Sequence, residues 1–274
     1  MNRKTKYIIA FIPILLLALA QFFPIYVIAL TSFKTPLALM EDGMSLSFIG
    51  LSLDNYQKVL SEDGFLGHIW VSLLIAMFAT FFSIVIGSLA AFALTRFKFR
   101  GKKFLTLTIL CSRMVPPVAL AMPVFLLVDV LGVHDTIWGL VLAHISFILP
   151  FCIWILLPFF GALPHDLGEA AVIDGLSSAK IFSKVYLPLA LPGILVASIF
   201  CFLFSWNDFL YSLILAGSET KTAPLAINAY MTSDRIEWGA MSASSMIVMV
   251  PIFLLSLLVQ KHFAKGVPSA GIKG

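Results

Sequence analysis

Long apolar segments constrain this chain more than any other feature of its sequence. A helix needs about 20 consecutive apolar residues to cross the hydrocarbon core of a bilayer. Six runs are about that long, at 7–30, 68–94, 104–128, 136–163, 191–216 and 239–260. Only 12% of the residues are charged, which is about half the fraction usual in soluble domains. The sequence therefore predicts an all-α polytopic membrane protein with a single transmembrane domain over residues 1–274.

The first apolar run has two possible interpretations. It follows a basic cap at residues 3–6, and residues 18–20 (ALA) resemble a signal-peptidase site, as in a cleaved leader. However, the run continues to Leu30, which makes it longer than the apolar region of a leader. We therefore expect a retained first span.

The positions of the basic residues predict the orientation of the chain. Thirteen of the 18 Lys and Arg residues lie in the two termini, in the loop at 96–103 and in a central polar stretch at 164–190. Because short loops rich in Lys and Arg stay in the cytoplasm, this pattern predicts six spans with both termini inside. The central stretch and the tail at 261–274 are then cytoplasmic. Topology explains the excess positive charge, so no nucleic-acid partner is expected.

The chain lacks the sequence signatures of catalysis and of metal binding. It has no GxxxxGK[ST], HExxH or GxSxG motif. Cys111, Cys152 and Cys201 lie in separate apolar runs without CxxC or Cys/His spacing, as expected of small buried hydrophobic residues. We therefore expect no enzyme, no metal site and no disulfide. Energy for any transport would come from outside this chain.

The central stretch carries the signals of two short helices. Pro164 fits a first helical turn, and Asp166 and Glu169 place negative charge near the positive end of that helix. Gly175 fits a left-handed C-terminal cap, and Ser177 fits the N-cap of the helix that follows. The stretch therefore predicts a helix, a sharp turn and a second helix.

The first of these helices has a shallow apolar surface that suits docking into a groove of a partner protein. The apolar side chains are those of Leu167, Ala170, Ala171 and Ile173. The alternative is a helix that lies in the lipid headgroups, but such helices carry bulky apolar residues and a basic polar face. Here the polar face carries Glu169 and Asp174, which anionic lipid would repel. These charges favour docking.

The same stretch resembles the EAA motif of membrane subunits of ATP-binding-cassette (ABC) importers. The matching residues are Glu169-Ala170-Ala171, Asp174-Gly175, Ile181-Phe182 and Leu187-Pro188. Three further similar segments are AAFALTRF at 90–97, SWNDFL at 205–210 and GVPSAGIKG at 266–274. The resemblance covers nearly the whole chain and is strongest to carbohydrate permeases of the maltose type. The loop at 32–67 matches no motif of these proteins.

This resemblance implies a type I ABC importer permease in the cytoplasmic membrane of a bacterium or an archaeon. It implies that the chain forms half of a pore for carbohydrate in a heterodimer with a second, related permease. The other implied partners are two copies of an ABC ATPase, an extracytoplasmic solute-binding protein and membrane lipid. ATP and Mg²⁺ would bind in the ATPase, and no cofactor would bind this chain.

The resemblance also implies which residues contact the ATPase. In this family the motif forms a coupling helix that sits in a cleft of the ATPase. The corresponding residues here are Leu167, Glu169, Ala170, Ala171, Ile173, Asp174, Gly175 and Leu176. The C-terminal tail reaches toward the ATPase dimer in such permeases. The tail residues that we assign to that contact are Gly266, Gly271, Lys273 and Gly274.

Four residues in the fifth expected span are candidates for a substrate path, namely Trp206, Asn207, Asp208 and Tyr211. A carboxylate within the membrane costs ~2.5–3.5 kcal/mol on insertion scales, so it should face protein or a water-filled cavity. The rings could stack on a sugar while the amide and carboxylate bind hydroxyls. Alternatively, the polar groups hold a neighbouring helix or free backbone groups. Asn228, in an external loop, is a further candidate at the outer pore.

Arg113 is a second charge inside an expected span, next to Pro116 and Pro117. The two prolines free backbone carbonyls and kink the helix, and Arg113 could pair with lipid phosphate, with a partner acid or with those carbonyls. Near the inner end of its span it could also snorkel to the headgroups. We favour snorkelling or a structural pair over a gate.

Two other classes of transporter stay open on the sequence alone. One is a related permease for a polyamine or a sugar phosphate, which a ligand screen on the cognate binding protein would distinguish. The other is an autonomous carrier or channel, which would move solute in vesicles that lack any ATPase. A membrane enzyme is disfavoured by the missing signatures.

Overall fold

The computed structural model describes the backbone of residues 3–44, 46–232 and 235–266, and the side chains of these residues except 3–10, 42 and 258–266. Within these ranges the regular elements are helices, and two isolated bridges, Lys34–Leu51 and Met231–Ile236, are the only extended pairings. The chain divides into two compact units. Unit 1 holds residues 1–67 and 226–253, and unit 2 holds 68–225 and 254–274. That both units form a single transmembrane domain stays a prediction.

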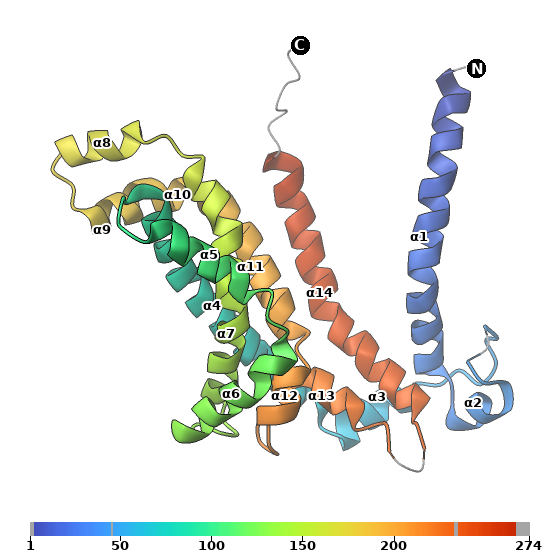
Figure 1. Ribbon diagram of the computed structural model, residues 1–274. Coiled ribbons are helices and arrows are strands. Elements are labelled where there is room, and N and C mark those ends of the chain that lie inside the picture. The colour runs from blue at the N-terminus through green and yellow to red at the C-terminus, as the bar shows by residue number, and fades with distance from the viewer. Residues whose placement is uncertain (1–2, 45, 233–234, 267–274) are drawn as a thin grey trace. The chain divides into compact units, whose positions relative to one another are not determined.

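Unit 1 begins with a long helix and continues through short helical segments (Figure 1). The elements up to the start of unit 2 are α1 (Arg3–Phe33), α2 (Pro36–Asp42), α3 (Asp54–Gln57) and the π-helical turn η1 (Lys58–Glu62). Three further helices cross the boundary between the units in sequence, namely α4 (Phe65–Arg96), α13 (Ala223–Asn228) and α14 (Trp238–Gly266).

Asn55 closes the end of α1 in unit 1. Its Nδ2 donates hydrogen bonds to the carbonyl oxygens of Ser32, at 3.0 Å, and Lys34, at 2.8 Å. The last carbonyls of a helix have no partner within the helix, so an amide donor at this position satisfies them. The Asn55 side chain also packs directly against the backbone of Gly239, where a Cβ atom would lie 2.6 Å from Nδ2. A glycine at the start of α14 is therefore required by close approach.

Unit 2 is a bundle built on three long helices. Its elements are α4 (Phe65–Arg96), α5 (Lys102–Ser112), α6 (Pro117–Val130), α7 (Ile137–Gly161), α8 (Asp166–Ile173), α9 (Ser178–Ile181), the π-helical turn η2 (Phe182–Tyr186), α10 (Leu187–Leu189), α11 (Leu191–Trp206) and α12 (Leu210–Leu215). Figure 1 shows α8 and α9 at one end of this unit and α6 and α12 at the opposite end.

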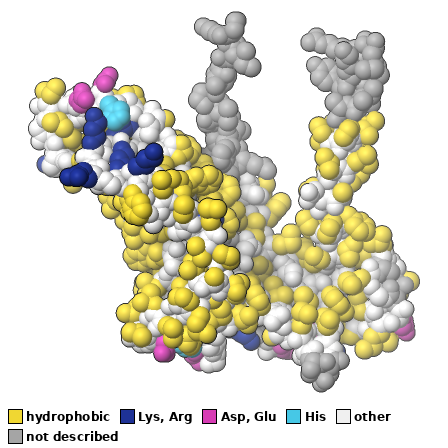
Figure 2. Space-filling view, in the orientation of Figure 1, with side chains coloured by type: hydrophobic (Ala, Val, Ile, Leu, Met, Phe, Trp, Pro, Cys, Tyr) yellow, Lys and Arg dark blue, Asp and Glu magenta, His cyan; other side chains and the backbone are white. Residues whose placement is uncertain are grey.

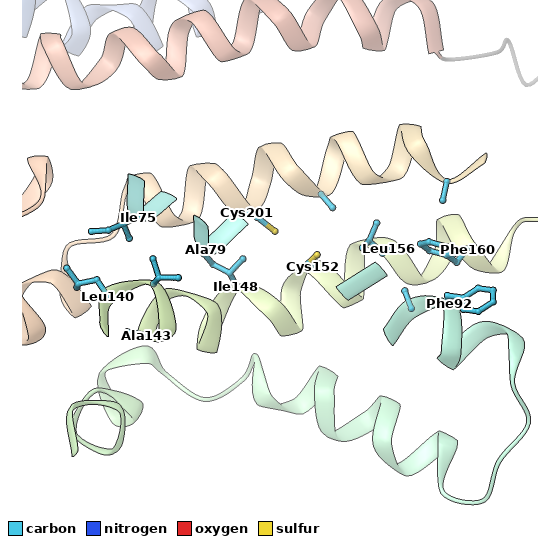
Figure 3. Packing of buried hydrophobic residues seen from close by; sticks show 14 of the residues in the cluster. Ile75, Ala79, Phe92, Leu140, Ala143, Ile148, Cys152, Leu156, Phe160 and Cys201 are labelled. Atoms are coloured by element: carbon cyan, nitrogen blue, oxygen red, sulfur yellow. The ribbon is translucent and has the colours of Figure 1, made fainter. Parts of the chain in front are cut away.

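The core of unit 2 lies where α4, α7 and α11 pack together (Figure 3). Small side chains let these helices approach closely. A Cβ atom at Gly87 on α4 would lie 2.7 Å from the Cys152 sulfur on α7. Cys152 and Cys201 point toward one another across the interface of α7 and α11 in Figure 3, and both are free thiols. Cys111 is also a free thiol, but its side chain is exposed, where the sequence suggested a buried one.

Two of the expected spans are broken rather than straight. The run at 104–128 forms α5 and α6, which are bent by 102° at a break around Pro116. Proline removes a donor from the helix and restricts the residue before it to extended conformations, which explains the break. The run at 191–216 is interrupted at Asn207–Phe209, between α11 and α12.

The other four expected spans correspond to continuous helices. Among the described residues, α1, α4, α7 and α14 are long and apolar enough to cross a membrane, and up to six spans result if each of two bent helix pairs counts as one. One of these pairs is α5 with α6, and the other combines residues 178–189 with α11, at a bend of 79°. The number of six spans and the orientation with both termini inside stay predictions.

Candidate functional site

The central polar stretch forms the end of unit 2 as a compact helical hairpin. Helix α8 begins at Asp166, two residues later than Pro164 suggested, and His165 occupies its N-cap. Gly175 follows with a φ of +76°, which is the left-handed conformation expected of a C-terminal cap. Ser177 is the N-cap residue of α9, but its side chain makes no capping hydrogen bond.

Most of the basic side chains of unit 2 lie at this end. Figure 2 shows basic and acidic side chains over the hairpin, whereas hydrophobic side chains cover the length of the bundle beside it. The exposed basic residues here are Lys98, Arg100, Lys103, Lys180 and Lys184. This separation of polar end and apolar side is what a helix bundle in a membrane requires.

The predicted docking residues on α8 divide into an exposed and a buried set. Ile173 is the most exposed large apolar side chain of α8, at 86%. Glu169, Ala170 and Asp174 are also exposed, whereas Ala171 is buried against the rest of unit 2. The expectation that Ala171 contributes to the exposed apolar surface is therefore corrected, because Ala171 lies on the inward side of the helix.

The other predicted docking residues differ in how far they are exposed. Leu167 is partly exposed, at 40%, and Gly175 is exposed at the turn. Leu176 is only half-buried and packs against the core of unit 2. Val172, which the sequence interpretation omitted, is exposed and adds to the apolar surface beside Ile173. The one signal in the sequence for a role of Val172 was its position inside the EAA motif.

Arg96, which served in the sequence analysis as a marker of topology and as part of the similar segment at 90–97, connects three elements of unit 2. It is the last residue of α4, and its Nη2 donates hydrogen bonds to the carbonyl oxygens of Phe160 and, at 2.7 Å, Leu163. Its guanidinium carbon lies 4.4 Å from the centroid of the Tyr186 ring in η2. The guanidinium thus binds one carbonyl in the last turn of α7 and one just beyond it, where the helix dipole favours positive charge.

The residues at the break between α11 and α12 were the candidates for a substrate path, and most of them are packed inside unit 2. Trp206 is 1% exposed and stacks on Phe202, with ring centroids 5.7 Å apart. Tyr211 is equally buried and stacks on Phe147 at 5.3 Å. Neither ring is free to stack on a sugar in this structure.

Asp208 also makes contacts within unit 2. Its Oδ2 accepts a hydrogen bond from the Ser212 backbone N–H at 3.1 Å and so closes the first turn of α12. The same oxygen lies 3.3 Å from Nε2 of His144 on α7, and His144 Nδ1 lies 2.6 Å from the Ser205 hydroxyl oxygen. These contacts favour the second of our two interpretations, in which Asp208 holds a neighbouring helix and free backbone groups.

Asn207 and Asn228 differ from the other candidates because both are exposed. Asn207 lies at the break in unit 2 and donates from Nδ2 to the Leu203 carbonyl at 2.8 Å. Asn228 ends α13.

His144 was missed in the sequence analysis. Its one signal in the sequence was that it is a lone histidine in the middle of an apolar run.

Arg113 forms a structural pair, in agreement with one of the roles favoured from the sequence. Its Nη1 donates to the carbonyl oxygen of Phe147 on α7 at 2.9 Å. Its guanidinium carbon also lies 4.7 Å from the Phe151 ring centroid and 5.5 Å from that of Phe204. Arg113 therefore ties the end of α5 to α7.

Asp135 fixes two loops of unit 2 at the end opposite the hairpin. Its Oδ1 accepts hydrogen bonds from the Thr220 hydroxyl at 2.6 Å and the Gly217 N–H at 2.8 Å. The Thr220 hydroxyl and nearby backbone donors stabilise the carboxylate and hold the pKa of Asp135 below its ordinary value. The loop after α6 and the loop after α12 are thereby joined.

Two further expectations from the sequence concern metal binding and the C-terminal tail. Among the residues that the structure describes, no three His, Cys, Asp or Glu side chains are grouped so that they could hold a metal ion. Of the tail residues assigned to an ATPase contact, Gly266 is the last residue of α14. Gly271, Lys273 and Gly274 lie outside the described residues.

Comparison with known proteins identifies the family. The family described as "binding-protein-dependent transport system inner membrane component" matches residues 83–268, which include the hairpin and the break between α11 and α12. The chain belongs to this family. The resemblance to importer permeases noted from the sequence is therefore confirmed, as is the prediction of a multi-pass membrane protein of the inner membrane.

Two relatives of this transport-system family align over most of their length. The trehalose transport system permease protein SugB of Mycobacterium tuberculosis is 34% identical over 242 residues, which are 87% of this chain and 88% of the relative. The trehalose/maltose transport system permease protein MalG of Thermococcus litoralis is 31% identical over 274 residues, which are 98% of each chain.

Solved structures of a bacterial transporter share the fold. A chain of a bacterial ABC transporter involved in the import of alginate, an acidic polysaccharide, matches with a TM-score of 0.81 and 21% identity, over 96% of this chain and 99% of that chain. The alginate transporter in complex with a periplasmic protein bound to an alginate pentasaccharide matches with a TM-score of 0.70 and 14% identity, over 93% and 94%. The predicted all-α importer permease fold is confirmed. As a permease subunit, the chain is a non-catalytic component of its transport system.

Proposed function

We propose that this chain is the membrane-spanning subunit of an ATP-driven, binding-protein-dependent carbohydrate importer and forms half of its translocation pore. Membership of the transport-system family supports the transport function, and the relatives named for trehalose and maltose favour a carbohydrate over a polyamine or a sugar phosphate. Family membership also disfavours an autonomous carrier or channel, because permeases of this family work as subunits.

The proposed assembly contains four kinds of component. A second, related permease completes the pore, two copies of an ABC ATPase bind at the cytoplasmic side, and an extracytoplasmic protein delivers the carbohydrate. ATP and Mg²⁺ bind in the ATPase, and this chain binds no cofactor. The alginate importer with its periplasmic protein is a structural neighbour with this kind of delivery component.

The observation that carries the coupling part of the proposal is the exposure of Ile173. It projects with Val172 from α8 at the charged end of unit 2, next to the carboxylate-bearing residues Glu169 and Asp174. A large apolar side chain exposed among charges is typical of a protein contact, whereas anionic lipid headgroups would repel the two carboxylates. We infer that this surface, together with Gly175, sits in a cleft of the ATPase.

In the proposed mechanism the partner ATPases supply the energy for transport. Closure of the ATPases on ATP displaces α8, and the helices joined to α8 rotate so that the pore opens outward. The binding protein releases the carbohydrate into the cavity shared with the second permease. Hydrolysis of ATP resets the pore to its inward opening, and the carbohydrate enters the cytoplasm.

For the substrate path we retain a narrower set of residues than the sequence suggested. Asn207 and Asn228 are exposed and able to bind sugar hydroxyls. Trp206, Asp208 and Tyr211 instead hold the break between α11 and α12, which positions Asn207. A contact of Gly266, Gly271, Lys273 and Gly274 with the ATPase remains part of the proposal on the strength of the sequence resemblance.

Purification of the chain with its native partners tests this function. We expect a second permease and an ABC ATPase to co-purify, and ATP hydrolysis to rise when the binding protein is loaded with trehalose or maltose. Parallel assays with a polyamine and with a sugar phosphate provide the comparison. Stimulation by one of these instead of a sugar would contradict the substrate class, and a chain that purifies without an ATPase would contradict the proposed assembly.

A further inference from the structure

A single side chain contacts both the proposed coupling helix and the arginine that ends α4. Tyr186, in the π-helical turn η2, is almost fully buried, at 2% exposure. One face of its ring lies under the Arg96 guanidinium, 4.4 Å from centroid to guanidinium carbon. Its hydroxyl end lies directly against the backbone of Gly168 on α8.

The contact at Gly168 explains why a glycine stands there. Gly168 does not have a positive φ, so its conformation does not demand glycine. A Cβ atom at this position would lie 2.5 Å from the Tyr186 hydroxyl oxygen and 3.3 Å from two ring carbons. Glycine permits such a close approach of a side chain to a helix backbone. The ring of Tyr186 therefore rests on α8 without an intervening side chain.

From Tyr186 the contacts continue into the membrane helices of unit 2. Arg96 binds the carbonyl oxygen of Phe160 in the last turn of α7 and that of Leu163 just after α7, and Arg96 itself ends α4. The ring of Tyr186 is also 5.3 Å from that of Phe92, one helical turn earlier on α4. The buried ring of Tyr186 therefore connects α8 to the ends of α4 and α7, so a displacement of α8 reaches both helices.

The covalent connection alone is a poorer route for such a displacement. The four residues between α7 and α8 are Ala162–His165, and they include no regular helix. A short irregular segment absorbs motion through its backbone dihedrals, whereas packed side chains in a dense core transmit it. The π-helical form of η2 fits this role, because such turns recur at functional positions in helices.

We propose that Tyr186 is a positioning residue that transmits movement of α8 to the ends of α4 and α7 through Arg96, with Gly168 as its seat on α8. This inference rests on the proposed function, in which α8 engages an ATPase. Gly168, Tyr186 and Arg96 lie outside the docking surface. They carry out the step between closure of the ATPase and rotation of the membrane helices.

The test is a pair of substitutions and their combination in the reconstituted complex. Gly168→Ala places a methyl group against the Tyr186 hydroxyl and should reduce the solute transported per ATP hydrolysed by at least roughly threefold. Tyr186→Phe keeps the ring on Arg96 and should stay within about twofold of wild type. In the double variant the hydroxyl clash is gone, so the ratio should return most of the way to that of Tyr186→Phe.

Two controls separate transmission from folding. Gly161→Ala is the matched glycine variant at the end of α7, where a Cβ atom meets only the Thr95 methyl group at 3.9 Å, and it should leave the ratio unchanged. Co-purification of the ATPase should be normal in every variant. Should Gly168→Ala reduce assembly, Tyr186→Leu, which keeps the glycine but removes the aromatic ring, should still lower the ratio.

A wild-type ratio in Gly168→Ala, or a double variant no better than Gly168→Ala, would overturn the inference. A wild-type ratio in Tyr186→Leu would overturn it as well. Failure of the proposed function looks different, because the wild-type complex itself would then show no carbohydrate transport driven by ATP.

Discussion

His144 Nε2 lies 3.3 Å from Oδ2 of Asp208, deep within unit 2. The pair joins the middle of α7 to the break between α11 and α12, and Ser205 completes it on the other nitrogen of the imidazole at 2.6 Å. Polar groups buried in an apolar bundle are costly unless they satisfy one another. The pair therefore specifies how the broken helix sits against α7.

Removal of the carboxylate should destabilise the protein as well as impair transport. Asp208→Ala leaves His144 without its acidic partner and removes the acceptor for the Ser212 N–H, at an expected cost of about 1–3 kcal/mol. Asp208→Asn keeps an acceptor and should cost less. The measurement is the thermal unfolding temperature of the purified complex. Asn207→Ala, at the neighbouring exposed position, serves as the control, and equal unfolding temperatures for Asp208→Ala and Asn207→Ala would contradict the structural role.

Close packing between α4 and α7 gives a second prediction. Gly87→Ala would place its Cβ atom 2.7 Å from the Cys152 sulfur, and overpacking of this kind costs typically about 1–3 kcal/mol. Cys152→Ala removes that sulfur and should restore part of the loss in the double variant. Gly67→Ala is a matched control, because nothing lies within 4 Å of its Cβ position. The measurement is the unfolding temperature of Gly87→Ala, Cys152→Ala, the double variant and Gly67→Ala. A Gly87→Ala variant as stable as the wild type would contradict this packing.

The turn after α8 gives a prediction about assembly. Gly175 has a φ of +76° with no atom within 4 Å of its Cβ position, so only backbone strain opposes a side chain there. Gly175→Val should weaken association with the ATPase without preventing membrane insertion, because a β-branched residue adopts this conformation at a cost of roughly 1–2 kcal/mol. Gly175→Asn should assemble better, since Asn tolerates the left-handed region. The yield of ATPase that co-purifies with each variant provides the readout, and a full complement with Gly175→Val would count against the docking role.

An ion pair in unit 1 gives a prediction about pH. The Lys58 ammonium pairs with the Glu237 carboxylate and, with Arg235, holds the pKa of Glu237 below its ordinary value of 4.5. A carboxyl with a lowered folded-state pKa contributes stability above its unfolded pKa and loses it as pH falls through the folded value. The contribution should therefore be present above about pH 4.5 and disappear below it.

Hydrogen exchange in residues 58–62 and 235–241, measured across this pH range, tests the prediction. Glu237→Gln should remove the pH dependence that stems from this pair, and Lys58→Arg should retain it. The effect is small, about 0.2–1 kcal/mol, because the Lys58 side chain is partly exposed. An unchanged pH profile in Glu237→Gln would show that the pair does not contribute.

The sequence predicted the features of this fold that depend on local residues. Long apolar runs predicted the four continuous helices, since their period and length need no knowledge of the partners. Gly175 was predicted as a left-handed cap because the requirement is local to the backbone.

Features that depend on pairs distant in sequence were not predicted. Ala171 is buried and Val172 exposed because unit 2 covers one side of α8, and helical periodicity alone does not state which side is covered. The tandem prolines at 116–117 indicated a kink but not a bend of 102° between α5 and α6. His144 and Arg96 acquire their roles only through partners 61 or more residues away in the chain.

Uptake in sealed vesicles tests the central claim most directly. The chain is reconstituted with its co-purified permease and ATPase, with ATP inside and the binding protein and radiolabelled trehalose or maltose outside. We predict that the labelled sugar accumulates against its gradient only when ATP, the ATPase and the binding protein are all present. Accumulation without the ATPase, or none with the complete system for any carbohydrate offered, would contradict the account.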